Sequence, residues 1–373
     1  MNTDSHRPAA RPDKKPPKQF YRTLGPALLA LAACQIAAPA QAAEADQFFF
    51  FPAAAYAWRS EDPAGAARKR EGEIDLDLFY TTDRGHLRFL AEVFGKTGGE
   101  SEIEIERLQI SWELWPGSRL WLGRFHNPIG YWNTDYHHGN YLQTTISRPG
   151  IDAFEDDGGV LPMHIAGALL EGYTALAGAL WRYDVALGAG PEINSGLQPV
   201  AVYQPGVGAH DASFTARLSW QPKDTNNQVG VFAGLNLFPG ASLTPVDVRQ
   251  QLAGLFTNWH FGTRTDLLAV IYFVDNELTS PGATTQESFR DGYIQLEQAL
   301  GAQWIAYGRA EGSSGATGNA YLNLLGGFVR ERQLIGLRYD LAKNQAVKAE
   351  ISKVHLLGDR FDQINLQWSA VYP

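Results

Sequence analysis

Cysteine is almost absent from this chain, and so are the short motifs that mark common catalytic centres. Cys34 is the one cysteine among 373 residues, which excludes an intrachain disulfide, a thiolate metal centre and a haem attachment motif. The Gly-x-Ser-x-Gly, His-Glu-x-x-His and phosphate-loop patterns are also missing. The sequence therefore predicts no catalytic residue and no cofactor, and it gives little support to an enzyme.

Long apolar runs are lacking as well from Asp46 onward. The nearest, MHIAGALLEGYTALAGALW at 163–181, is interrupted by His164, Glu171 and several glycines, whereas a membrane helix needs about 18 to 20 apolar residues in succession. The chain also has no excess of basic residues, and its net charge is −9. This acidic balance argues against nucleic acid as a partner.

The first 42 residues differ from the rest of the chain. Six basic residues lie within residues 1–22, and the apolar stretch LGPALLALAACQIAAPAQA then ends in a small-x-small pattern at residues 40–42. These are the parts of a secretory signal peptide, so the sequence predicts export, cleavage near Ala42 and a mature chain of residues 43–373. Removing six basic and two acidic residues takes the net charge from −9 to −13.

Two alternatives remain for this amino-terminal segment. Leu31 to Cys34 has the pattern of a lipoprotein box, in which Cys34 would become the lipidated first residue. A single membrane anchor is the other alternative, and it is less favoured because Pro26 and Pro39 interrupt the stretch.

Alternation of polar and apolar residues recurs through the rest of the chain. In EIDLDLFY, residues 73–80, Ile74 and Leu76 fall on one face, with Glu73, Asp75 and Asp77 on the other. A period of two indicates a strand with one wet and one apolar face. The predicted strands are roughly 47–59, 71–82, 86–96, 101–115, 119–126, 160–174, 178–189, 212–221, 228–237, 249–261, 264–275, 288–299, 302–311, 328–341, 346–356 and 361–372.

The strand count and the connections together predict an all-β, transmembrane antiparallel β-barrel of about 16 strands. Short connections alternate with longer ones, and the longest follows the fifth strand, as in barrels of the bacterial outer membrane. A sheet can cross a bilayer only when it is closed, since every backbone N–H and C=O must be hydrogen-bonded within the protein. In the fourth strand the apolar residues change parity, which predicts a bulge near Glu106 and Arg107.

The chain resembles the sixteen-stranded porin superfamily of Gram-negative bacteria, including its phosphate-selective branch. The features that carry the resemblance are the export segment, the strand count, RLWLGRFHNPIGYWN at the end of strand 5 and the final strand RFDQINLQWSAVYP. The resemblance implies that the loop at about 126–159 folds into the barrel and constricts it, and that the protein is a homotrimer in outer-membrane lipid. It also implies a terminal aromatic signal for the barrel-assembly machinery; here Tyr372 is followed by Pro373.

The charged residues of this loop indicate which solutes the predicted channel would favour. Phosphate recognition needs several Lys or Arg donors, but the loop offers Arg148 alone against five acids. We therefore expect passive diffusion of small hydrophilic solutes or ions, with a weak cation preference and Arg148 facing the acids across the lumen. The predicted constriction and lumen residues are Asp135, His137, His138, Arg148, Asp152, Glu155, Asp156, Asp157, Glu73, Asp75, Asp77 and Arg338.

Several other interpretations stay open. His126, His137 and His138 with Asp135 could bind Zn²⁺ or Cu²⁺, but adjacent residues of an extended segment point to opposite sides. We therefore expect these side chains to fasten the loop by hydrogen bonds, and we predict no metal.

The acids of AFEDDGG, 153–159, could instead form a solvated or divalent-bridged loop. The other classes of function are a non-conducting barrel that serves as scaffold, adhesin or sheath for a partner complex, a plugged transporter, a soluble periplasmic β-protein, and a phospholipase that would use Ser147 and His164.

Intact-mass measurement of the mature protein tests the cleavage site. We expect a chain that begins at Ala43, because residues 40–42 have the small-x-small pattern that signal peptidase requires. A mass corresponding to a lipidated chain beginning at Cys34 would contradict this expectation, and Cys34→Ser would then abolish the lipidated species.

Overall fold

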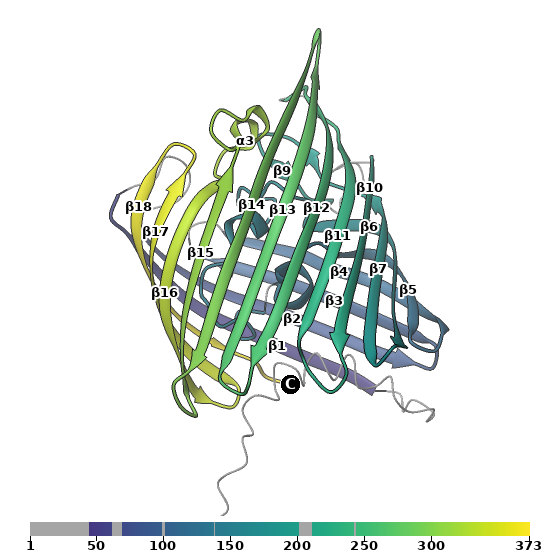
Figure 1. Cartoon of the computed structure of the whole chain (residues 1–373), viewed down its shortest axis with the longest axis vertical. Helices are drawn as coiled ribbons and strands as arrows, with labels where there is room; N and C mark the ends of the chain where they lie inside the picture. Colours follow the sequence, from purple (N-terminus) through teal and green to yellow (C-terminus); the bar gives the residue numbers. More distant parts are fainter. Residues whose placement is uncertain (1–44, 62–68, 99–100, 138, 201–210, 242–243) are drawn as a thin grey trace, which may run out of the picture.

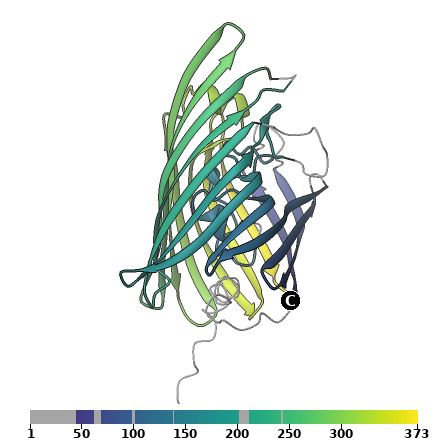
Figure 2. The same ribbon diagram turned by 90° about the vertical axis from the view of Figure 1, so that its right-hand side faces the viewer.

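Residues 45–61, 69–98, 101–137, 139–200, 211–241 and 244–373 are described by the structure, which is a computed structural model. The predicted signal peptide, with Cys34, and His138 lie outside the described residues. The described chain forms one closed antiparallel barrel of 16 strands (Figures 1 and 2). The predicted fold class is therefore confirmed.

The strands of the barrel follow the sequence pattern closely. They are β1 (Ala45–Arg59), β2 (Arg70–Arg84), β3 (Leu87–Thr97), β4 (Glu102–Trp115), β5 (Ser118–His126), β6 (His164–Leu176), β7 (Ala179–Ala189), β10 (Ala212–Pro222), β11 (Gln228–Phe238), β12 (Asp247–Phe261), β13 (Thr265–Ser280), β14 (Ala283–Ala299), β15 (Trp304–Ser314), β16 (Val329–Ala342), β17 (Gln345–Leu356) and β18 (Arg360–Ala370).

Closure of the barrel depends on β1, the first strand. Ala55 pairs with Gln367 of β18 on one side and with Glu73 of β2 on the other. The sheet consequently has no free edge, and the backbone groups of every strand find partners in its two neighbours.

The predicted faces of the strands are also confirmed. On β2, Ile74 and Leu76 point outward and are 60% and 40% exposed, whereas Asp75 and Asp77 are buried on the inward face. β18 repeats the pattern, with Leu366 outward and Asn365 and Gln367 inward.

β4 contains the predicted bulge. Glu92 of β3 pairs with Arg107, and the next residue, Val93, pairs with Ile105, so Glu106 is the extra residue of the bulged strand. A bulge bends its strand and re-aims a side chain. Glu106 accordingly points to the barrel interior, where it is buried.

One pair of strands is longer than predicted. The sequence placed the ends at 275 and 288, but β13 continues to Ser280 and β14 begins at Ala283, with these two residues paired. Pro281 and Gly282 form the turn, and Gly282 has a φ of +89°, which suits the second central position of a type II turn. Alternation therefore continues where a polar loop was expected, and this hairpin rises above the others (Figure 1).

The start of β1 and the end of β18 lie at the same end of the barrel. The connections between strands at this end are short, as predicted. The opposite end is less uniform than the sequence suggested, because the connections 98–101, 281–282 and 357–359 are also short. Its longer connections contain α2 (Trp132–Asp135), the 3₁₀ turn η2 (Gly150–Asp152), the two-stranded sheet of β8 (Glu192–Ile193) and β9 (Leu197–Gln198), and α3 (Ala320–Leu325).

α3 has capping residues at both ends. The Asn319 side chain accepts a hydrogen bond from Leu322 N, and Gly326 follows the helix with a φ of +68°. Among the described residues, no helix is both long and apolar enough to cross a membrane.

The outward face of the barrel carries a continuous apolar row across adjacent strands. Leu218, Val231, Leu255 and Ile271 are neighbours in register on β10 to β13, and each is exposed. An apolar outer band is what lipid chains require of a barrel.

Leu255→Arg tests this face. In a bilayer we expect the free energy of unfolding to fall by about 2 to 4 kcal/mol, because a cation near the midplane of the lipid-facing wall loses its hydration. Denaturant unfolding of the protein in vesicles measures the change. The matched control is Leu300→Arg in the connection between β14 and β15, where we expect a loss of about 0 to 1 kcal/mol; equal losses at both positions would contradict the membrane orientation.

Candidate functional site

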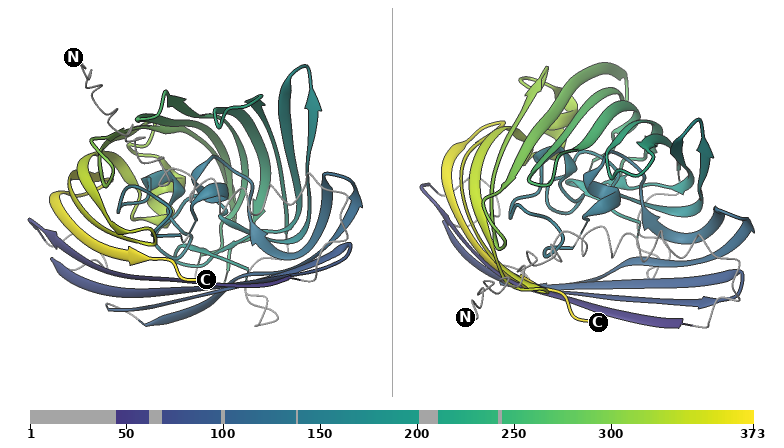
Figure 3. Two further views of the ribbon diagram at one scale, coloured as in Figure 1. Left: turned by 90° about the horizontal axis from the view of Figure 1, so that it is seen from below. Right: turned by 60° about the horizontal axis from the view of Figure 1, so that its bottom comes forward.

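The connection between β5 and β6, residues 127–163, lies inside the barrel; we refer to it as the inner loop (Figure 3). Its carbonyl groups accept hydrogen bonds from Arg338 of β16 and Lys348 of β17. In the order of strands around the barrel these two lie on the far side from β5. Contacts of this kind can form only across the lumen.

Charged side chains of β16 and β17, on the opposite wall of the barrel, bind the backbone of the inner loop. Arg338 Nη1 donates to Tyr141 O at 2.7 Å and to Gln143 O at 3.0 Å. Lys348 Nζ donates to Thr145 O at 3.2 Å, and Glu350 accepts from Ile146 N at 3.1 Å. A loop inside a barrel has few water molecules for its backbone groups, so these charge-assisted bonds satisfy donors and acceptors that burial would otherwise leave without partners.

Apolar packing holds the other side of the inner loop. Trp132 and Ile151 are fully buried in one cluster with inward-facing residues of β11 to β14. The Trp132 ring lies edge-on to Tyr293, with 6.4 Å between centroids, and the Tyr131 ring is 6.0 Å from that of Phe256. Each such aromatic side chain contributes roughly 1.5 to 3 kcal/mol on full burial. This side of the lumen is therefore packed rather than open.

Gly130 and Asp152 fix the loop against β13. Gly130 has a φ of +62°, and a Cβ there would lie 2.1 Å from Tyr272 Oη, so only glycine fits. Tyr272 Oη donates to Asp152 Oδ1 at 2.5 Å. Burial raises the pKa of Asp152 to about 6, although the Tyr272 hydrogen bond and the charge of Arg148 act in the opposite direction.

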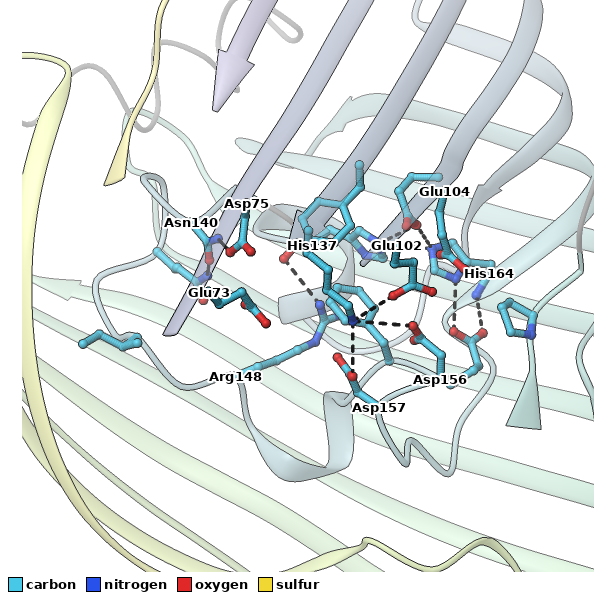
Figure 4. A pocket seen from close by; sticks show the side chains of 18 residues that line it. Glu73, Asp75, Glu102, Glu104, His137, Asn140, Arg148, Asp156, Asp157 and His164 are labelled. Atoms are coloured by element: carbon cyan, nitrogen blue, oxygen red, sulfur yellow. Dashed lines mark hydrogen bonds and ion pairs between the residues drawn. The ribbon is translucent and has the colours of Figure 1, made fainter. Parts of the chain in front are cut away.

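A cavity of about 130 Å³ remains between the inner loop and strands β2 to β4 (Figure 4). Acidic side chains dominate its lining. They come from β2, β4 and the inner loop, and are Glu73, Asp75, Glu102, Glu104, Glu106, Glu155, Asp156 and Asp157.

Lys96 of β3 is the cation that faces the loop acids across this cavity. Its Nζ lies 2.9 Å from Glu102 Oε2, 3.9 Å from Asp156 Oδ2 and 3.5 Å from Asp157 Oδ1. Burial and then repulsion from Asp157 raise the pKa of Asp156 to about 7, against the opposing charge of Lys96. Acidic side chains outnumber the basic ones in this lining, so the cavity carries a net negative charge when its carboxyl groups are ionised.

Arg148 has a different place from the one we expected. Its guanidinium donates to the Asp152 carbonyl and, at 3.1 Å, to Asn133 Oδ1, and it lies 3.8 Å from the Phe154 ring centroid. These partners belong to the inner loop itself. Arg148 therefore braces the loop from within while one edge of it lines the cavity.

The predicted site residues have different places in the structure. Those lining the cavity are Glu73, Asp75, His137, Arg148, Glu155, Asp156 and Asp157. Asp152 and Arg338 dock the inner loop, Asp135 lies 3.6 Å from Arg217 on the wall, and Asp77 is buried on β2. His138 lies outside the described residues.

Sequence reasoning missed Lys96 and the position of Glu106 in the cavity lining. Lys96 has the same parity on β3 as the buried Glu92, which was a usable signal. Glu106 lies at the predicted bulge, where side chains are re-aimed. Ser147 and His164, the pair considered for a phospholipase, have separate hydrogen-bond partners: Ser147 Oγ bonds to Glu350 and Asn365, and His164 to Glu155.

The fold is a closed 16-stranded barrel with a loop from the fifth strand inside it, and solved outer-membrane proteins share this fold. No family model and no curated protein matches the sequence. Among solved structures, the chain is similar to the outer membrane channel DcaP of Acinetobacter baumannii, with a TM-score of 0.58 and 10% identity, covering 89% of this chain and 99% of that one.

The chain is also similar to two further solved structures. OmpF of Salmonella typhi in complex with daunomycin has a TM-score of 0.55 and 11% identity, covering 88% of this chain and 100% of that one. OmpT of Vibrio cholerae has a TM-score of 0.53 and 10% identity, covering 88% and 98% respectively. Identities this low show a shared fold, that of a transmembrane porin barrel, and no more.

Asp152 gives the docked loop a pH dependence. Its pKa of about 6 in the folded protein exceeds the ordinary 3.8, so the folded state binds the proton more tightly than the unfolded chain does. The contribution of Asp152 to the free energy of unfolding is then greatest below about pH 4 and falls by roughly 3 kcal/mol as the pH rises from about 4 through 6. Asp152→Asn, which cannot ionise, should lose this part of the pH dependence.

Denaturant unfolding in detergent at pH 4, 5, 6 and 7 measures the difference between wild type and Asp152→Asn. Other acids titrate identically in both proteins, so the difference isolates this carboxyl group. Parallel curves for the two proteins would show that Asp152 titrates normally.

Proposed function

We propose that this protein is an outer-membrane channel for passive diffusion of small hydrophilic solutes, with a preference for cations. The observation that carries the proposal is the acid-lined cavity between the inner loop and β2 to β4. The inner loop acts as the constriction, since it fills the side of the lumen next to β11 to β14 and leaves the polar cavity next to β2 to β4.

Charge in the cavity supports the cation preference. Carboxylates that converge on a narrow, low-dielectric passage raise the local concentration of cations and repel anions. Lys96 is surrounded by three acids, so it reduces this preference without reversing it. Phosphate selectivity is disfavoured because Arg148 is engaged by the loop's own backbone.

The remaining expectations on location and assembly stay predictions. The porin fold and the descriptions of the similar structures as outer membrane proteins support an outer-membrane location. Export through residues 1–42, insertion by the barrel-assembly machinery and a homotrimer follow from the sequence resemblance, and chemical crosslinking in outer-membrane vesicles would test the trimer.

A second candidate is a non-conducting barrel that serves as a scaffold. The apolar cluster between the inner loop and β11 to β14 favours it, because a lumen packed in this way is narrow. Planar-bilayer recording separates the two functions: stepwise openings support the channel, whereas a silent bilayer containing correctly folded protein supports the scaffold.

Reversal potentials in a KCl gradient test the selectivity. We expect wild type to prefer K⁺, and the double substitution Asp156→Asn with Asp157→Asn to lower the permeability ratio of K⁺ to Cl⁻ by about twofold or more. Lys96→Met should raise the ratio. Asp135→Asn is the matched control, because Asp135 is held at the wall by Arg217; anion preference in wild type would overturn the proposal.

A further inference from the structure

Three imidazoles and one carboxylate meet at the side of the cavity, and we call them the histidine cluster: Glu106, His126, His137 and His164. They come from the β4 bulge, the end of β5, the inner loop and the start of β6. Each offers one ligand atom, and these atoms lie within 4.8 Å of one another. Imidazole nitrogen and carboxylate oxygen are the donors that zinc and copper ions take in proteins.

We propose that the histidine cluster binds a divalent transition-metal ion of the zinc class and thereby pins the inner loop to the barrel wall. A metal was the less favoured interpretation of the sequence, which offered His126, His137 and His138 with Asp135, because adjacent residues of an extended segment point to opposite sides. The fold supplies other ligands: His164 and Glu106, which are distant from His137 in sequence.

The distances within the cluster suit a tetrahedral ion. Bonds of about 2.0 to 2.2 Å place the ligand atoms of a tetrahedral site about 3.3 Å apart. Here the separations are 2.7 Å for His164 Nε2 to Glu106 Oε2, 3.1 Å for His164 Nε2 to His137 Nε2 and 3.7 Å for His137 Nε2 to Glu106 Oε2. Three ligand atoms are thus already arranged close to one face of a tetrahedron.

His126 provides the fourth ligand. Its side chain is 8% exposed, and its ring stacks on that of His137 with 3.3 Å between centroids. His126 Nε2 makes no hydrogen bond with any described residue and lies 3.5 Å from Glu92 Oε2. A buried nitrogen without a hydrogen bond is costly, and coordination would remove that cost.

The groups behind the histidines set their tautomers. His164 Nδ1 lies 3.1 Å from Glu155 Oε2, and His137 Nδ1 lies 2.7 Å from Asn133 Oδ1. The Asn133 amide is oriented by its Nδ2, which donates to the carbonyls of Asn127 and Met163. Both Nδ1 atoms therefore donate to oxygen, and in the neutral rings the two Nε2 lone pairs face each other.

Such a pair of lone pairs beside a carboxylate needs a cation. Acceptors behind metal-binding histidines fix the ring and raise its basicity in the same way. A proton on His164, donated to Glu106, is the competing occupant. The acidic cavity supplies a route for metal ions, since His137, His164 and Glu106 line it. Arg124 Nη2 lies 3.9 Å from Glu106 Oε2 and opposes the ion. Glu155 offsets this charge, whereas Glu92 is paired with Arg107.

Bound metal would join β4, β5 and β6 to the inner loop at one point. A link of this kind removes conformational entropy from the loop. The metal would also fix the backbone of His137, whose carbonyl oxygen accepts a hydrogen bond from Arg148 Nη1 at 3.4 Å.

Calorimetric titration of ZnCl₂ into the full-length mature protein tests the proposal. The protein carries no histidine tag, is folded in detergent and is freed of metal with a chelator. We expect one zinc ion per chain with a Kd below about 10 µM. His137→Gln with His164→Gln should weaken binding at least 100-fold, whereas His86→Gln, the matched control on an exposed side chain, should bind as wild type does.

Glu155→Gln tests the positioning role of the carboxylate behind His164. We expect zinc affinity to fall about 10- to 100-fold with the barrel intact, and heat-modifiable gel migration verifies folding of each variant. Unchanged zinc affinity would contradict the positioning role of Glu155 behind His164.

Cobalt(II) titration of wild type gives a measurement that needs no variant. Four-coordinate cobalt with nitrogen and oxygen ligands shows intense visible d–d absorption, which we expect at one equivalent. Absence of stoichiometric zinc binding, or cobalt spectra of a hydrated six-coordinate ion, would overturn the proposal and leave a proton as the occupant. Metal binding is measured independently of conduction, so a protein that binds zinc without conducting would refute the proposed function alone.

Discussion

The need to satisfy backbone polar groups away from water governs this molecule at two levels. In the wall, pairing of β1 with both β2 and β18 closes the sheet, so that no strand leaves its N–H and C=O groups without partners in lipid. In the interior, the inner loop has no neighbouring strand to pair with. Several of its carbonyl and amide groups are bound by charged side chains of the opposite wall, and others by the backbone of the loop itself.

This second solution explains why the barrel interior is divided. Strands β15 to β17 carry buried Arg309, Arg338, Lys348 and Glu350, which bind the backbone of the loop. Strands β11 to β14 carry inward aromatic and aliphatic residues, which pack on Trp132 and Ile151. The acids that neither group needs remain on β2 and β4 and line the cavity. Polar space in the lumen is therefore a consequence of where the loop docks.

The histidine cluster lies where these arrangements meet. His126 and His164 are the residues at which the chain leaves β5 and enters β6, and they pair with each other across the two strands. The bulge directs Glu106 toward them, and the inner loop returns to deliver His137. A link at this point would restrain both ends of the loop, while Arg338, Lys348 and Glu350 hold its middle.

Much of the fold could be predicted from the sequence, because a period of two records which face of a strand meets water. Sixteen strands, the inward set Glu73, Asp75 and Asp77 and the bulge at Glu106 were all readable from neighbouring residues alone. The β13–β14 hairpin was predicted too short, since the polar residues of its upper half resemble a loop.

The site could be predicted only in part. Sequence spacing pointed to the acids at 155–157 but gave Arg148 the place that Lys96 holds. Which residues meet across a lumen depends on strand register and on the path of the inner loop, and both are long-range properties that no local pattern encodes. A closed barrel with a polar interior and an acidic loop could be predicted from the sequence alone. The convergence of Glu106, His126, His137 and His164 could not, because it requires closing the barrel and folding the loop inward, which bring together residues up to 58 positions apart.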